Sequence, residues 1–131
     1  MEIFKVGCRP QKRASSDYFY GNVFQDPIIE TPEPARVRAI KVSFEPKART
    51  AWHSHPLGQT LFVVSGVGLV GLRDESPRII SVGDTVWFPP GEEHWHGATK
   101  DSPMEHIAIQ EALDGKVANW LEQVLDDDYY L

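Results

Sequence analysis

Two pairs of histidines, each with the pattern His-x-His, are the residues of this chain best suited to chemistry. His53 and His55 form the first pair and His94 and His96 the second, in a chain with only five histidines. In a β-strand, residues i and i+2 point to the same face, about 6.5–7 Å apart. Two imidazoles on one face can converge on a metal ion, because each nitrogen binds at about 2.0–2.1 Å. The pattern therefore predicts a metal site built on strands.

A glutamine completes the predicted donor set. Gln59 follows a turn made by Pro56 and Gly58, so its amide oxygen can return to the same centre. Three histidines and one amide oxygen leave room for water or a substrate, which is typical of catalytic rather than structural sites. The alternatives are that a His-x-His pair is a hydrogen-bonded pocket pair, and that the glutamine orients a water. The predicted ligands are His53, His55, Gln59 and His94.

Further polar residues are candidates for a pocket beside the predicted metal. In the segment 104–111, MEHIAIQE, strand alternation places His106 and Gln110 on one face and two isoleucines on the other. His96 belongs to the second His-x-His pair. Both His96 and His106 either move protons, because imidazole titrates near neutral pH, or line the interior with ordinary hydrogen bonds.

The elements that must position these residues are short strands separated by turns. Apolar and polar residues alternate over 40–44, which is the period of a strand with one apolar face. The glycine-containing run 60–72 predicts a buried strand, a turn and a second strand. The segments 78–82 and 86–88 predict two more strands joined by a tight turn. Many short strands at this spacing predict an all-β barrel or sandwich.

The two ends of the chain differ from this pattern. Apolar residues recur at helical spacing near the C-terminus, at Val117, Trp120, Leu121, Val124 and Leu125. They predict an amphipathic helix at about 116–126, packed against the outside of the barrel. Prolines break the first part of the chain, so about 1–35 is predicted to be an irregular arm. Its aromatic stretch YFYGNVF forms either an edge strand or a contact with a second subunit. One domain spanning 1–131 is expected.

Composition narrows the classes of function. A chain of 131 residues forms one domain, and its formal net charge is −6. After residue 50 there are four basic and thirteen acidic residues, which argues against nucleic-acid or anionic-membrane partners. The single cysteine, Cys8, excludes an intrachain disulfide, and the N-terminus lacks the apolar run of a signal peptide. We therefore expect a cytoplasmic protein that acts on a small molecule.

Two stretches carry a resemblance to a known family. HSHPLGQTLFVVSG resembles the first cupin motif, and GDTVWFPPGEEHWHG resembles the second, with Gly83, Pro89, Gly91 and His94 in step. Two positions depart from the cupin pattern. Lys47 stands where a glycine is usual, which affects a turn, and Gln59 stands where glutamate is usual, which changes the charge of the site. The words HPLGQ and HWHGA resemble the small bacterial cupins that include manganese-dependent hydroxynitrile lyases.

The resemblance covers about residues 44–116 and implies a fold, a metal and a pocket. The implied fold is a cupin β-barrel (jelly roll) with a short C-terminal helix. The implied cofactor is a divalent metal, manganese first, with Fe, Zn, Ni, Co and Cu left open. Small cupins of this type imply a homo-oligomer, a dimer or a tetramer. The implied metal ligands are His53, His55, Gln59 and His94, and the implied catalytic-pocket residues are Thr50, His96, His106 and Gln110.

The charge of the donor set bears on the reaction. Three neutral imidazoles and an amide leave a divalent ion with its full charge, which favours Lewis-acid chemistry on a bound oxygen. The same donors do little to stabilise a trivalent ion, which argues against a redox oxygenase. The first hypothesis is therefore a metal-dependent hydroxynitrile lyase that cleaves or forms aromatic cyanohydrins such as mandelonitrile. The alternatives are a metal-dependent cupin dioxygenase and a non-catalytic small-molecule-binding cupin.

Overall fold

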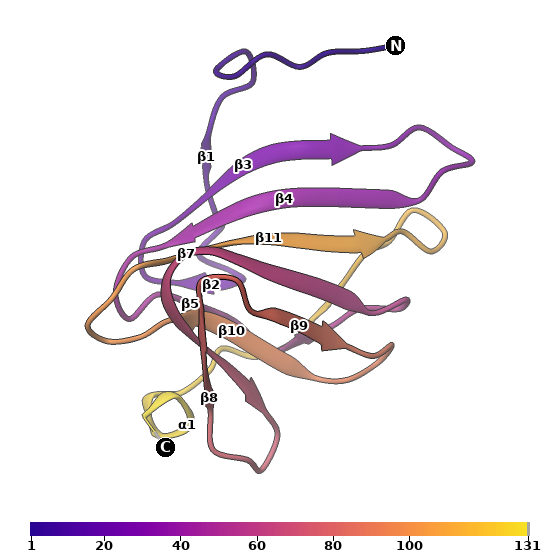
Figure 1. The fold of residues 1–131 in the computed structure, drawn as a ribbon. Coiled ribbons are helices and arrows are strands. Elements are labelled where there is room, and N and C mark those ends of the chain that lie inside the picture. Colours follow the sequence, from indigo (N-terminus) through magenta and orange to yellow (C-terminus); the bar gives the residue numbers. More distant parts are fainter. Residues whose placement is uncertain (131) are drawn as a thin grey trace.

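The computed structural model describes residues 1–130, which form β-strands curled into a half-barrel and one very short helix (Figure 1). The strands of the first half are β1 (Lys12–Arg13), β2 (Phe19–Tyr20), β3 (Val23–Glu30), β4 (Val37–Phe44), β5 (Arg49–Thr50) and β6 (His53–Ser54). Those of the second half are β7 (Gln59–Leu72), β8 (Arg78–Ser81), β9 (Thr85–Phe88), β10 (His94–Ala98), β11 (Met104–Glu111) and β12 (Asn119–Trp120). The helix α1 spans Asp126–Tyr129.

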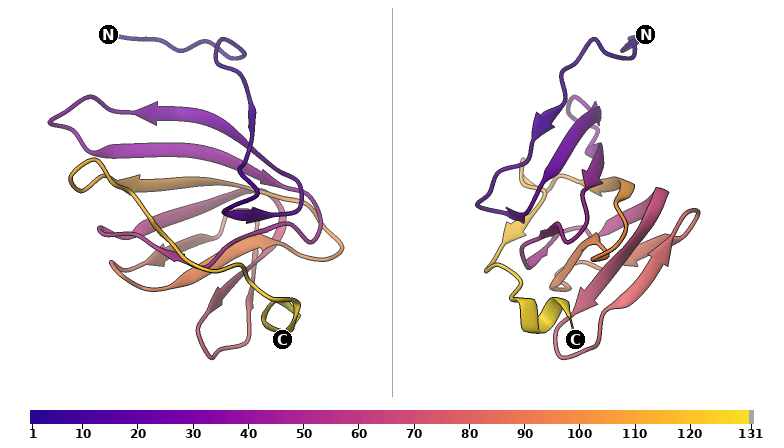
Figure 2. Two further views of the ribbon diagram at one scale, coloured as in Figure 1. Left: turned by 180° about the vertical axis from the view of Figure 1, so that it is seen from behind. Right: turned by 90° about the vertical axis from the view of Figure 1, so that its left-hand side faces the viewer.

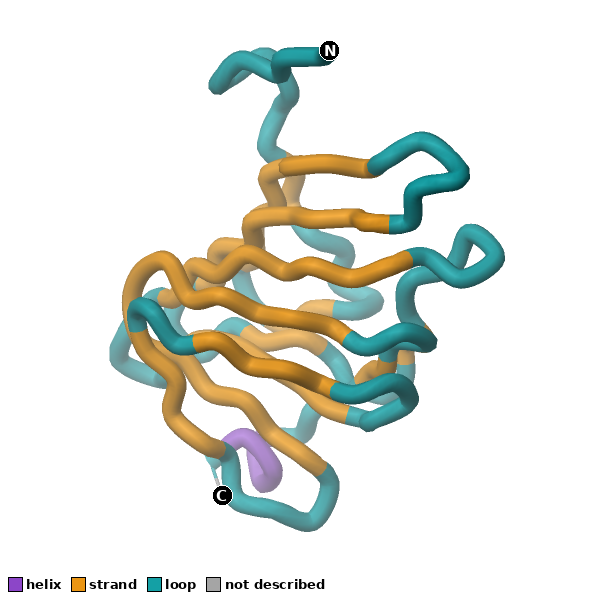
Figure 3. The backbone as a smooth tube through the Cα atoms, turned by 45° about the vertical axis from the view of Figure 1, so that its right-hand side comes forward, coloured by secondary structure: helices purple, strands orange, loops and turns teal. Residues whose placement is uncertain are grey.

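All pairings are antiparallel, and the main path of the sheet runs β1-β3-β4-β11-β7-β10-β5-β2. Strand β7 joins the two walls of the half-barrel, because it pairs with β11 and β9 along its first part and with β10 and β8 along its second (Figure 3). Strands β8 and β9 therefore lie beside β7 rather than beside each other. Apolar residues facing inward from both walls form the core, with Phe44, Val63 and Met104 almost fully buried.

The predicted strand–turn–strand over 60–72 is wrong, because β7 runs through this segment without a break. Its bend lies at Gly66, whose φ of +74° is in the left-handed region that favours glycine. A Cβ at this position would also overlap the carbonyl oxygen of Pro103. Glycine thus lets one long strand turn from the first wall into the second.

The predicted helix over about 116–126 is also wrong. The segment after β11 turns back at Asp114 and Gly115, which both have positive φ, and then runs extended along the barrel. Within it, Asn119 and Trp120 form β12 and pair with β6. Helical structure begins only at Asp126 and lasts four residues. Paired positive-φ residues are typical of a tight hairpin turn, which sends the chain into a strand rather than a helix.

The N-terminal arm, predicted to be irregular over about 1–35, contains the eight-residue strand β3. Pro27 is compatible with this strand because β1 pairs only with Phe24 and Gln25, so the outer edge is unpaired at the proline. The N-terminal end of the chain extends away from the barrel (Figure 2), and the side chains of Arg9 and Gln11 hydrogen-bond β3. No helix of residues 1–130 is long and apolar enough to span a bilayer.

Candidate metal centre

Strands β6, β7 and β10 and the turn after β6 bring the four predicted ligands together inside the half-barrel. Strand β6 begins with His53, whose register partner on β10 is His94. His55 follows β6 by one residue, and Gln59 is the first residue of β7. The ring of His53 lies 5.0 Å from that of His55 and 4.3 Å from that of His94, between ring centroids. The predicted cluster therefore exists as a cluster in space.

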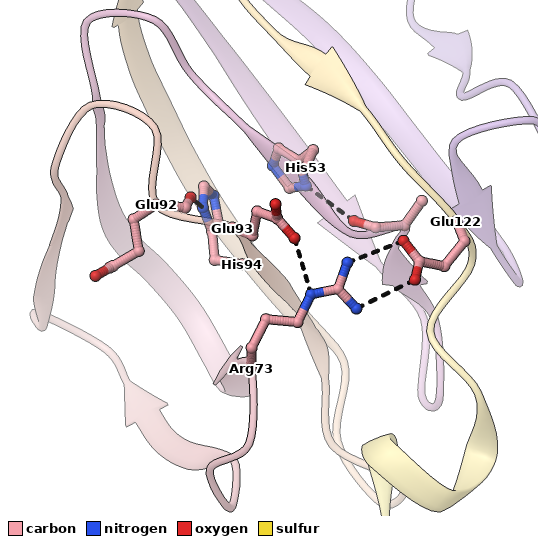
Figure 4. A network of polar contacts seen from close by, with 7 residues as sticks. His53, Arg73, Glu92, Glu93, His94 and Glu122 are labelled. Carbon is pink, nitrogen blue, oxygen red and sulfur yellow. Dashed lines mark hydrogen bonds and ion pairs between the residues drawn. The ribbon is translucent and has the colours of Figure 1, made fainter.

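Backbone carbonyls fix the orientation of all three predicted histidine ligands. The Nδ1 atoms of His53, His55 and His94 lie 2.9, 2.8 and 2.9 Å from the carbonyl oxygens of Ala51, Val117 and Glu92, respectively. Two of these contacts are visible in Figure 4. A carbonyl oxygen can only accept, so each Nδ1 carries the proton and donates it. Each neutral ring then presents the lone pair of Nε2, the tautomer that metal-binding histidines require.

The amide oxygen of Gln59 and the Nε2 of His94 face each other, and each atom directs a lone pair toward the other. The Oε1 of Gln59 lies 3.1 Å from the Nε2 of His94. The Nε2 of Gln59 donates to the Oε1 of Gln110, and the Nε2 of Gln110 donates to the carbonyl oxygen of Arg38. This chain of hydrogen bonds fixes which amide atom of Gln59 faces His94. A cation between two facing acceptors removes the repulsion between their lone pairs, so the donor set fits a metal ion.

The pKa values of the five histidines agree with neutral rings. Burial is the largest cause in every case, and it lowers the pKa of His94 and of His106 to about 3. The pKa of His53 and of His96 falls well below the usual value, because burial is reinforced by the neighbouring histidines. Burial also lowers the pKa of His55, against opposing contacts with the Val117 carbonyl and Gln59. A metal ion would therefore not compete with protons at neutral pH.

His96 lies closer to the centre than the sequence predicted. Donor nitrogens of His53, His94 and His96 lie within 4.8 Å of one another, whereas His55 falls outside this group. The Nε2 atoms of His55 and His96 are both buried without a hydrogen-bond partner among the described residues. His96 therefore joins His53 and His94 in the tightest group of donor nitrogens, with the Gln59 amide oxygen beside His94. His96 is therefore placed either to bind the metal ion itself or to contact a substrate bound to that ion.

His96 and His106 form a hydrogen-bonded pair of buried rings. The Nε2 of His106 lies 2.9 Å from the Nδ1 of His96, and within residues 1–130 the other ring nitrogen of each histidine has no hydrogen-bond partner. Thr50 helps to position His96, because its hydroxyl oxygen accepts a hydrogen bond from the backbone N–H of His96. Gln110 holds Gln59, as described above. The structure therefore brings all four predicted pocket residues to the site but gives Thr50 and Gln110 positioning contacts.

A cavity of about 170 Å³ opens over this cluster. Its polar lining contains seven of the eight predicted site residues, all except His94, and its apolar wall includes Ile40, Val42 and Ala108. His94 lies behind the cavity, stacked on Phe88 with ring centroids 3.6 Å apart. Trp87 of β9 does not line the cavity and is 57% exposed.

Sequence analysis missed one side of the cavity. Phe19 of β2 and three residues of the C-terminal segment, Val117, Ala118 and Trp120, line it as well. The predicted helix had placed this segment on the outside of the barrel. The Asp114–Gly115 pair was the available signal, because Asp-Gly between apolar segments is a strong hairpin pattern.

The comparisons with known proteins agree with the fold. A cupin-domain family model matches residues 40–110. The chain is 50% identical over 129 residues to the (R)-mandelonitrile lyase of Granulicella tundricola, covering 98% of each chain. Its fold matches that of a cupin-like protein from Thermotoga maritima with a TM-score of 0.84 and 40% identity, over 98% of this chain and 95% of the other.

A polyketide cyclase from Streptomyces resistomycificus shares the fold alone, with a TM-score of 0.76 and 16% identity over 99% of this chain and 90% of that one. The predicted cupin barrel is thus confirmed. Because the family model covers more than half of the chain and two relatives match nearly all of it, the chain belongs to the cupin family.

Proposed function

We propose that this cupin is a metal-dependent lyase that cleaves or forms aromatic cyanohydrins such as mandelonitrile. The identity of 50% to a mandelonitrile lyase, over nearly the whole of both chains, makes the protein an enzyme. The substrate and the reaction remain a proposal for this chain. The observation that carries it is the pair of facing lone pairs on Gln59 and His94, beside a cavity that also contains a histidine pair.

The proposed ligands are His53, His55, Gln59 and His94, with manganese as the proposed divalent ion. All four donors are neutral, so they leave the charge of the cation uncompensated. When bound, such an ion supplies Lewis-acid chemistry, which lowers the pKa of a hydroxyl group that it contacts. Nitrogen and oxygen donors also suit Fe, Co, Ni, Cu and Zn, so only elemental analysis identifies the ion.

The His96–His106 pair is suited to moving one proton in a closed cavity. Two neutral imidazoles have two ring protons; one lies in the hydrogen bond between them and the other on an outer nitrogen. Whichever tautomer is present, the pair therefore offers one acceptor and one donor at its ends. It can accept the hydroxyl proton of a cyanohydrin at one end and release a proton at the other.

The balance of the reaction matches this arrangement. The O–H bond of the cyanohydrin breaks, a C=O bond forms, and the carbon–carbon bond to the nitrile breaks with its electron pair on cyanide. The proton released by the pair then converts cyanide to hydrogen cyanide. No oxidant or reductant is consumed, and passage of one proton through the pair moves the ring proton of each imidazole to its other nitrogen; transfer in the opposite direction restores the first state.

The size of the cavity favours a small aromatic substrate. An apolar protein cavity of about 150 Å³ is known to hold benzene. The 170 Å³ cavity here has a similar volume and an apolar wall that includes Ile40, Val42 and Trp120. A phenyl ring can therefore occupy the apolar side while the hydroxyl and nitrile groups face the histidines.

The direct experiment is a mandelonitrile assay with an oxygen electrode. The manganese-loaded protein should release benzaldehyde and cyanide with no oxygen uptake, and protein stripped with a chelator should be inactive. Oxygen uptake in step with turnover would place the protein among the dioxygenases instead. Binding of aromatic cyanohydrins without any turnover would leave a non-catalytic binder.

We also propose that the protein is a cytoplasmic homo-oligomer, a dimer or a tetramer. The one cysteine, Cys8, is free and exposed, as suits a reducing compartment. In the arm before β1, Ile3 and Val6 are 66% and 104% exposed, and mutual burial between copies would cover such side chains. Sedimentation should give a mass of at least twice 14.8 kDa at micromolar concentration. A lone 14.8 kDa species would contradict this.

A further inference from the structure

The extended segment 117–120 contacts both histidines of β6. The carbonyl oxygen of Val117 accepts the Nδ1–H of His55 at 2.8 Å. Three residues later, Trp120 is the register partner of His53. This segment therefore reaches two of the proposed ligands from a part of the chain that is 62 residues away from His55.

Aromatic stacking adds a second contact to His53. The ring of Trp120 stacks on that of His53, with centroids 4.6 Å apart and planes inclined by 30°. Tyr18 also stacks on Trp120, with centroids 4.7 Å apart and an angle of 14°. The Trp120 ring is thus held between the exposed Tyr18 and a buried ligand histidine. With Nδ1 bonded to the Ala51 carbonyl, the His53 ring has little freedom to rotate.

Contacts on either side of segment 117–120 hold it against the barrel. Before it, Leu113 and Lys116 close the Asp114–Gly115 turn with two backbone hydrogen bonds. After it, both side-chain oxygens of Glu122 accept hydrogen bonds from Arg73, which also bonds Glu93 (Figure 4). Strand β6 has only two residues, and its partners are β10 and β12. On one side of β6, the neighbouring strand is therefore β12 of the C-terminal segment.

We infer that residues 117–120 are a positioning strap that sets the metal affinity of the site, with Trp120 as its principal side chain. The inference rests on the proposed ligands His53 and His55. The strap holds both rings in the rotamers that direct Nε2 to the centre, before any ion binds. Residues that orient ligand histidines typically change metal affinity 10- to 100-fold when replaced. Trp120 is a positioning residue rather than a catalytic one in this account.

The test measures manganese affinity and needs no cyanohydrin. Trp120→Leu removes the stacked ring but keeps an apolar side chain, and Trp120→Phe restores a flat ring. Trp87→Leu is the matched control, because Trp87 is exposed on the outer face of the sheet. Competition with a chelator of known affinity gives the dissociation constant for Mn²⁺. Tryptophan fluorescence gives an independent signal, since a paramagnetic ion quenches an indole that stacks on its ligand.

The strap predicts a graded result. The dissociation constant should rise about 10- to 100-fold in Trp120→Leu, rise less in Trp120→Phe, and stay unchanged in Trp87→Leu. Quenching by Mn²⁺ should be reduced in Trp120→Phe and retained in Trp87→Phe. Equal affinity in wild type and Trp120→Leu would overturn the strap while leaving the proposed metal site intact. Wild-type protein that binds no divalent ion would overturn both.

Tyr18→Ala provides a second test if Trp120→Leu does not fold. Tyr18 is 40% exposed and touches the strap only from outside, so its removal leaves the core intact. It should weaken Mn²⁺ binding several-fold in protein whose far-ultraviolet circular dichroism is unchanged. Affinity equal to that of the wild type in folded Tyr18→Ala would mean that the stack does not brace His53.

Discussion

The directions of hydrogen bonds decide which atoms of this site face its centre. Three Nδ1–H groups point to backbone carbonyls, so three lone pairs remain on Nε2. The Gln59 amide is oriented indirectly, through Gln110 and the carbonyl of Arg38. None of these hydrogen-bond partners is a proposed ligand. Each one nevertheless fixes the tautomer of a ligand histidine or the orientation of the Gln59 amide.

Gln110 should therefore control metal affinity through Gln59. Gln110→Leu removes the acceptor for the Gln59 amide nitrogen, so the amide can turn that nitrogen toward His94. We expect Mn²⁺ binding to weaken about 10- to 100-fold. Gln110→Glu keeps an acceptor for Gln59 and should retain the affinity. Chelator competition measures both variants, and equal binding by Gln110→Leu and the wild type would show that Gln59 needs no such support.

His106 should matter for rate rather than for metal. His106→Ala removes one imidazole of the His96–His106 pair. Proton transfer by a positioned side chain typically raises the reaction rate about 10²–10⁴-fold. The expected result is a loss of mandelonitrile turnover in that range, with unchanged manganese content by elemental analysis. Turnover at the wild-type rate would show that His96 or solvent moves the proton alone.

The residues of the site were accessible from the sequence, but two of their roles were not. The two His-x-His pairs were predictable because strand alternation fixes the faces of i and i+2 residues, and Gln59 because a turn returns the chain to the same centre. Gln110 was predictable from its shared strand face with His106, whereas Thr50 came from the family resemblance alone. Their positioning contacts depend on the backbone N–H of His96 and on the Arg38 carbonyl, whose places no local pattern encodes.

Among the elements, β7 does most to shape the half-barrel, because it belongs to both walls. It begins with the proposed ligand Gln59 and turns at Gly66 from β11 toward β10, the strand that starts with His94. The bend therefore sets the angle between the walls that carry these two donors.

Gly66→Ala should destabilise the fold more than Gly83→Ala. Both glycines have positive φ, and a left-handed conformation costs a non-glycine residue about 1–2 kcal/mol. A methyl group at Gly83 meets nothing within 4 Å, whereas at Gly66 it overlaps the Pro103 carbonyl. Overpacking adds about 1–3 kcal/mol, so Gly66→Ala should lose roughly twice as much free energy of unfolding. Urea titrations of both variants measure this; equal losses would contradict the close approach.

The C-terminal segment shows where sequence patterns compete. Val117, Trp120, Leu121 and Val124 do have helical spacing, but their side chains are not on one helix face in the protein. Long-range pairing of β12 with β6 and the positive-φ turn at Asp114 and Gly115 override the local periodicity. A short apolar pattern cannot record a partner strand far away in the chain: Trp120 pairs with His53, which lies 67 residues earlier.

At the scale of the whole molecule, the fold encloses all of its histidines. The five histidines are only 0–4% exposed, and within residues 1–130 none of them forms a hydrogen bond or an ion pair with a carboxylate. The barrel class was predictable from the number and spacing of short strands. The complete burial of the histidines was not, because it depends on how the C-terminal segment and β2 cover the open side.

This burial should make the metal-free protein sensitive to mild acid. The pKa of every histidine is lowered in the folded state, mainly by burial. From pH 6.5 down toward 3, the unfolded chain binds more protons than the folded one, so stability falls with falling pH. The thermal midpoint should drop between pH 7 and pH 5, and less steeply in His106→Leu. A constant midpoint over that range would contradict neutral buried rings.

The central claim is that one divalent ion, held by neutral donors, makes this cupin a cyanohydrin lyase. The most direct measurement is a manganese titration of chelator-stripped protein, following benzaldehyde release from mandelonitrile and oxygen concentration together. The account predicts activity that rises linearly, reaches a plateau at one equivalent of Mn²⁺ per chain and consumes no oxygen. Full activity in stripped protein, or activity that requires oxygen, would contradict it.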